Sequence, residues 1–129
     1  MTPTALNALS KQVLGAAFRV HTTLGPGLLE SAYAACLVYE LRKLGLKVET
    51  EVHVPIVYEG VKLTDVGYRI DILVAGELVI EVKSLEGISA VHVAQLVSYL
   101  RLADRRIGLP LNFNVEHLRE GIYRRVNKF

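Results

Sequence analysis

The chain has few of the residues that build covalently linked or membrane-bound structures. It contains one cysteine, Cys36, in 129 residues, and a single cysteine cannot form an intrachain disulfide, a CxxC site or a four-thiolate iron–sulfur cluster. No stretch approaches the roughly 18 uninterrupted apolar residues of a membrane-spanning helix, and no basic segment followed by an apolar run opens the chain. We therefore expect a cytoplasmic protein without a membrane partner.

Net charge is also small, at +2, which by itself does not indicate a nucleic-acid-binding protein. The charge is unevenly distributed: residues 101–129 hold seven Lys and Arg against three acids, or +4, which leaves −2 on residues 1–100. A basic end beside an acidic centre would suit a phosphate backbone that approaches a bound cation. A solvated charged surface explains any single arginine of this end equally well.

Length and hydrophobic periodicity predict one α/β domain over residues 1–129. About half of the residues are hydrophobic, which is enough for a core in a chain of this size. Helical spacing of apolar residues predicts helices over 3–23, 28–44 and 89–103, and period-two spacing or short apolar runs predict strands over 48–56, 67–74, 78–84 and 107–113. Residues 121–126 fit either a final strand or a short helix.

Two of the predicted strands carry charges in unexpected places. Asp71 lies in the apolar run of residues 70–74, and Glu81 and Lys83 lie in the apolar run of residues 78–83. Burial of an isolated carboxylate or ammonium costs several kcal/mol, so such groups persist when they are paired, neutralised or bound to a metal. These three residues are therefore the first candidates for a functional site.

The loop between the two strands predicts how the acids meet. Three loop residues, 75–77, place position 74 opposite 78 and position 71 opposite 81, so both carboxylates would share one face with Cβ atoms about 5 Å apart. Two carboxylates that close favour a divalent cation or a shared proton, and hard oxygen donors favour Mg²⁺ or Mn²⁺. An ion pair of Lys83 with either acid, without any chemistry, explains the hairpin equally well.

The motif formed by these residues resembles that of a known superfamily. Asp71, followed after nine residues by Glu81-Val82-Lys83, resembles the core motif of the PD-(D/E)XK nucleases, with Ile70 in place of the motif's proline. Residues 27–33, GLLESAY, match the signature of the small GxxExxY proteins, and residues 95–99, QLVSY, match the QxxxY element of RecB-type members. Residues 21–27 and 111–115 are also similar to the GxxExxY family. The resemblance implies a restriction-endonuclease-like core with a mixed sheet of four or five strands flanked by helices.

The resemblance also implies roles for individual residues. Lys83 would orient or help deprotonate the attacking water, and the metal would act as Lewis acid. The RecB-type cluster cysteines are missing, so an iron–sulfur cofactor is not expected. The metal ligands would be Glu30, Asp71, Glu81 and the carbonyl of Val82.

Three further residues are candidates for contact with the substrate. In the resemblance, Gln95 and Tyr99 would contact metal-bound water or the nucleic-acid backbone, and their spacing of four puts them on one helix face. Tyr33 lies three residues after Glu30 and is a candidate to orient that carboxylate or to line the substrate site. A core tyrosine without a functional role is an equally good interpretation of Tyr33.

The expected activity is metal-dependent hydrolysis of phosphodiester bonds in nucleic acid, with DNA as the expected substrate and Mg²⁺ or Mn²⁺ as the cofactor. The alternative is a non-catalytic nucleic-acid- or protein-binding module that keeps the fold, and a third possibility is a small-molecule phosphodiesterase. Retention of Glu30, Asp71, Glu81 and Lys83 favours catalysis. The short chain suggests a homodimer by analogy.

Overall fold

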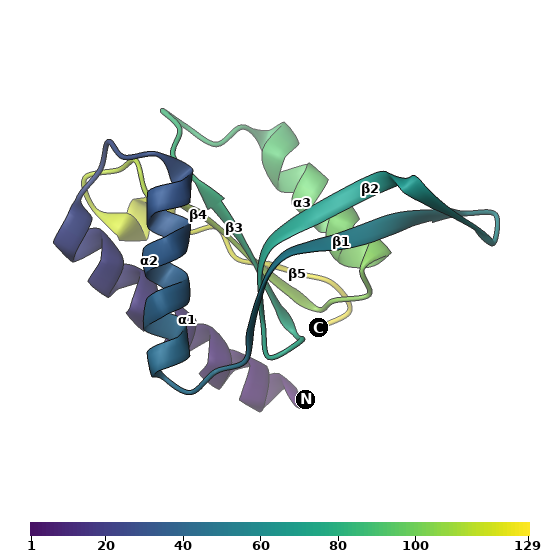
Figure 1. The fold of residues 1–129 in the computed structure, drawn as a ribbon, viewed down its shortest axis with the longest axis horizontal. Coiled ribbons are helices and arrows are strands. Elements are labelled where there is room, and N and C mark those ends of the chain that lie inside the picture. Colours follow the sequence, from purple (N-terminus) through teal and green to yellow (C-terminus); the bar gives the residue numbers. More distant parts are fainter.

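The computed structural model describes residues 1–129. It has three α-helices, one short 3₁₀ helix and a five-stranded sheet (Figure 1). In chain order the elements are α1 (Pro3–Leu24), α2 (Glu30–Lys43), β1 (Val48–Tyr58), β2 (Val61–Val74), β3 (Leu78–Lys83), α3 (Ala90–Leu102), β4 (Ile107–Asn112), the 3₁₀ helix (Leu118–Gly121) and β5 (Arg125–Val126). Each predicted helix and strand is therefore present, and residues 121–126 hold the end of the 3₁₀ helix and a two-residue strand. None of the helices has the length and hydrophobicity needed to span a lipid bilayer.

The sheet is mixed, which confirms the predicted α/β class. Its strands lie in the order β1-β2-β3-β4-β5, with β3 and β4 parallel and the other neighbours antiparallel. Helices α1 and α2 pack on one face through a cluster of 20 buried residues, and α3 packs on the other through a smaller cluster (Figure 1). The first residue of α2 and the last residue of β3 both line the same hollow, described below.

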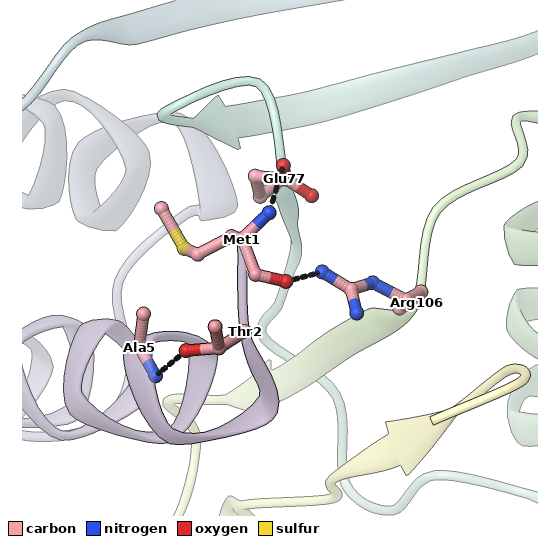
Figure 2. Close-up of polar contacts among 5 residues, drawn as sticks. All are labelled: Met1, Thr2, Ala5, Glu77 and Arg106. Carbon is pink, nitrogen blue, oxygen red and sulfur yellow. Dashed lines mark hydrogen bonds and ion pairs between the residues drawn. The ribbon is translucent and has the colours of Figure 1, made fainter.

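The start of α1 is fixed by polar contacts (Figure 2). The Thr2 hydroxyl accepts a hydrogen bond from the backbone N–H of Ala5 at 3.1 Å, which caps the helix. The Arg106 guanidinium donates to the Met1 carbonyl, and the terminal ammonium lies 3.7 Å from the Glu77 carboxylate. The helix is thereby tied to the β2–β3 turn and to the chain just before β4.

Strands β1 and β2 extend beyond the rest of the sheet as a two-stranded arm (Figure 1). The strand that the sequence predicts to begin at residue 67 begins at Val61 instead. The first seven residues of β2 are exposed, so they carry no burial pattern from which a strand is recognised. The pairing register shifts between Pro55 and Ile56.

Candidate active site

The predicted acids lie where β2 and β3 separate. Val74 pairs with Leu78, as the three-residue loop predicts, but the pairing of the two strands ends at Ile72 opposite Ile80. One residue further, an Asp71 carboxylate oxygen, Oδ2, accepts a hydrogen bond from the backbone N–H of Val82 at 2.9 Å. The Asp71 side chain therefore occupies a backbone donor of the neighbouring strand at the point where the two strands part.

Side-chain alternation along β2 is interrupted at Asp71. Ile70 packs in the cluster under α3, whereas Ile72, two residues later, packs in the cluster under α1 and α2. On β1, Glu51 lies opposite this position in the left-handed region, with φ of 52°, while its two neighbours pair normally with Ile72 and Ile70. Such irregularities re-aim side chains beside functional sites.

As a result, Asp71 and Glu81 line different hollows. The prediction that both carboxylates share one face of the hairpin is wrong. Asp71 lines a hollow of about 690 Å³ together with Glu30, which we call the α2 hollow. Glu81 lines a second hollow of about 60 Å³ under the third helix, which we call the α3 hollow. Lys83, the last residue of β3, lines both. Val82 also lines the α2 hollow, and its side chain is buried in the core.

Glu81 is the most perturbed ionisable group of the chain. Its side chain is 7% exposed, and its Oε1 is buried without a hydrogen-bond partner. Burial raises the pKa of Glu81 from 4.5 to about 7, against the opposing effects of the Lys83 ammonium and the peptide N–H of Asp71, and the Glu30 carboxylate adds to the rise. A buried, incompletely satisfied acid in a strand is a common feature of functional sites.

No ion pair within 4.0 Å involves Asp71, Glu81 or Lys83. The interpretation of these residues as a plain structural ion pair therefore has no support in the geometry. The Lys83 ammonium acts on Glu81 through its electric field, which opposes the rise in the pKa of Glu81 that burial causes.

The donors of the predicted set are carboxylate oxygens, whose chemistry suits a hard divalent cation. Mg²⁺ keeps several waters and is usually bound by one or two carboxylates together with substrate phosphates, and an unpaired buried carboxylate oxygen is available on Glu81. No three Asp, Glu, His or Cys side chains lie close enough together to hold one ion. The Glu30, Asp71 and Glu81 carboxylates are therefore not assembled around one point.

Glu30 is the first residue of α2 and reaches the site from a tightly held turn. The Ser84 hydroxyl donates to the Leu28 carbonyl at 2.6 Å, so the residue after β3 fixes the residues that precede α2. The Tyr33 hydroxyl accepts from the Leu28 N–H at 3.1 Å and donates to the Gly25 carbonyl at 2.5 Å. Both bonds order the residues 25–28 that deliver Glu30.

Tyr33 itself is a core residue. Its side chain is fully buried, and its ring stacks on Phe113 with centroids 4.6 Å apart. The suggested contact of Tyr33 with substrate is wrong for this position, because no surface of the side chain is available. In the GxxExxY signature, the tyrosine therefore orders the turn that precedes the acid, and it does not contact the substrate.

We expect Tyr33→Phe to destabilise the protein by about 1–3 kcal/mol, because it leaves the Leu28 N–H and the Gly25 carbonyl without their partner. Urea denaturation measures this loss. Tyr39→Phe is the matched control, since Tyr39 is 64% exposed. Equal denaturation midpoints for the two variants would contradict the role assigned to the Tyr33 hydroxyl.

Gln95 and Tyr99 lie on one face of α3, as their spacing predicts, and line the α3 hollow with Glu81 and Lys83. The Gln95 amide donates to the Tyr99 hydroxyl at 3.3 Å. Tyr99 also stacks on Tyr68 of β2, with centroids 3.8 Å apart and ring planes within 4°. These two residues therefore face Glu81 and not the α2 hollow.

The sequence does not single out Tyr68 and Arg69 as candidates for the site. The Tyr68 hydroxyl is buried without a partner in the α3 hollow, and Arg69 lines the α2 hollow. Both residues lie at the start of the strand predicted over residues 67–74, before the apolar run of residues 70–74 in which a charge stands out. The only signal that pointed to them was their proximity in sequence to Asp71.

None of the seven Lys and Arg of residues 101–129 lines the α2 hollow or the α3 hollow. Arg125 of β5 pairs with Gly108 of β4, whereas Lys83 of β3 pairs with Asn112 of the same strand. Four strand residues separate these positions, or about 13 Å. The cations that share the α2 hollow with Asp71 are instead Lys83, Arg69 and Arg42.

The chain was compared with known proteins. The model of a family described as the PD-(D/E)XK nuclease superfamily matches residues 7–126. Neither the curated proteins nor the solved structures contain a match to the chain. The narrower GxxExxY assignment stays a prediction. With Asp71 and Glu81-Val82-Lys83 on adjacent strands of a mixed sheet, and with nearly the whole chain matched, this protein belongs to the PD-(D/E)XK nuclease superfamily.

Proposed function

We propose that the chain is a metal-dependent nuclease that hydrolyses phosphodiester bonds, with DNA as its substrate. The observation that carries the proposal is the buried Oε1 of Glu81, which has no hydrogen-bond partner and belongs to a carboxyl group whose charged form is disfavoured by burial. A bound cation compensates such a group, and no ion pair does so. Membership of a nuclease superfamily supports the same conclusion.

Mg²⁺ or Mn²⁺ is the proposed ion. Glu81 and Asp71 would hold it, with Glu30 and the Val82 carbonyl as further donors, and it would supply Lewis-acid activation of water and phosphate. Lys83 lines both hollows, so its ammonium is available to orient the attacking water and to screen charge on the phosphate. Gln95 and Tyr99 would contact the substrate from the α3 side.

The test is incubation of the purified chain with single- and double-stranded DNA and RNA in the presence of Mn²⁺, with EDTA as the control. We expect cleavage of DNA that stops when EDTA is added and that is lost in Asp71→Ala. Binding of nucleic acid or protein without cleavage would favour the non-catalytic module instead. Cleavage unchanged in Asp71→Ala would mean that another site, or another protein, is responsible.

We also propose a homodimer and a cytoplasmic location. The homodimer is inferred from the short chain and by analogy. A cytoplasmic location rests on the cysteine content and on the lack of a membrane-spanning helix.

A further inference from the structure

We infer that the nucleic acid enters the α2 hollow as a single strand, with Arg69 binding a phosphate beyond the cleaved bond. This inference rests on the proposed function, because it concerns how the substrate reaches Asp71 and Lys83. It is carried by four properties of the α2 hollow: its length, its volume, its walls and the positions of its cations.

The hollow continues well beyond the acids. The residues of α2 that line it begin at Glu30 and end at Arg42, and they follow one face of the helix. Twelve residues of helix correspond to about 18 Å. Arg69 and Thr50, on the sheet side, also line it. The α2 hollow is therefore an elongated groove between a helix and a sheet, with the catalytic candidates at one end.

The volume of the groove favours a single strand over a duplex. About 690 Å³ is within the range of 300–1,000 Å³ that encloses one drug-sized molecule, which corresponds in size to a short segment of one strand. A B-form duplex is much broader than one strand, since its two grooves alone are about 6 and 12 Å wide. Such a duplex could rest over the opening but could not lie inside it.

The walls favour contact with the phosphate backbone over contact with bases. On the helix side, the short side chains of Ser31, Ala34 and Ala35 allow a nucleic-acid strand to approach α2 closely. No aromatic side chain lines the groove, and sequence-independent binding of bases normally uses aromatic stacking. The strand is therefore held by its phosphates, and recognition is independent of base sequence.

Three cations that can contact phosphates line the groove. Lys83 lies with the acids, and Arg42 and Arg69 also line it. The Arg42 guanidinium donates to the Val48 carbonyl at 3.1 Å, which fixes it. Arg69 is 64% exposed and lies 3.9 Å from the exposed Glu51 carboxylate. A surface pair of that length is weak, so a phosphate can replace Glu51 as the partner of Arg69.

The test measures binding without cleavage. A fluorescent single strand of mixed sequence and the same sequence as a blunt duplex are titrated with the protein in EDTA, over a range of salt concentrations. We expect the single strand to bind at least about tenfold more tightly than the duplex. In Arg69→Ala the dependence of log K on log salt should become shallower by about 0.7, the value for one phosphate contact on a single strand.

The control is Arg101→Ala, which removes the same charge from the last turn of α3, on the other face of the sheet. Arg69→Lys should restore most of the salt dependence, and the urea midpoint of each variant checks its fold. Equal binding of duplex and single strand, or equal effects of Arg69→Ala and Arg101→Ala, would overturn the inference. Tight, Arg69-dependent binding without Mn²⁺-dependent cleavage would uphold it and would overturn the proposed function instead.

Discussion

Lys83→Met is expected to lower the rate of Mn²⁺-dependent cleavage by about 10²- to 10³-fold, the usual loss when one electrostatic stabiliser of a transition state is removed. Lys83 lines both hollows, and its charge opposes the rise in the pKa of Glu81 that burial causes. Methionine keeps most of the length and apolar volume of lysine but has no charge. Single-turnover cleavage of a labelled DNA strand measures the rate of the chemical step.

The matched control for this variant is Lys62→Met on the exposed arm, which changes net charge by the same amount. Lys83 makes no ion pair within 4.0 Å, so its replacement leaves no carboxylate without a bonded partner, and we expect the fold to persist. Equal cleavage rates for Lys83→Met and Lys62→Met would remove Lys83 from the catalytic mechanism.

Glu81→Gln is expected to change the pH dependence of stability in metal-free protein. The pKa of Glu81 is raised by burial from 4.5 to about 7 in the folded chain, so the folded state binds more protons than the unfolded state between these values. Its contribution to stability is therefore fully present below pH 4.5 and is lost as the pH rises through 7. The loss amounts to about 3 kcal/mol at pH 8.

Urea denaturation in EDTA between pH 4.5 and 8 measures this effect. The stability of Glu81→Gln relative to the unmodified chain should rise across this range by about 3 kcal/mol. Glu116→Gln serves as the control, because the Glu116 side chain is 88% exposed, and its curve should run parallel to that of the unmodified chain. Parallel curves for Glu81→Gln as well would mean that Glu81 is not the buried acid described above.

The elements of the fold could be predicted because their signals are local. Thr2 caps α1, helical spacing marks the three helices, and the odd loop at 75–77 sets the pairing of Val74 with Leu78. The start of β2 was predicted too late because its outer residues face solvent on both sides. A strand without a buried face has no alternation that a sequence can display.

The sequence predicted which residues form the candidate site better than it predicted their arrangement. Asp71 and Glu81 stood out because charges are rare in apolar strands, a signal that needs no knowledge of the fold. Strict alternation then predicted one shared face, and the interruption at Asp71 broke that rule. The role of Tyr33 depends on hydrogen bonds to Gly25 and Leu28, which a sequence motif cannot reveal.

We propose that the Asp71 carboxylate on β2 and the Glu81 carboxylate on β3 bind a divalent cation. Calorimetric titration of the metal-free chain with Mn²⁺ at pH 8 measures this directly. We expect binding to the unmodified chain and to Glu116→Gln, and its loss in both Asp71→Asn and Glu81→Gln, since each removes one charged oxygen donor. Unchanged Mn²⁺ affinity in both carboxamide variants would contradict the claim.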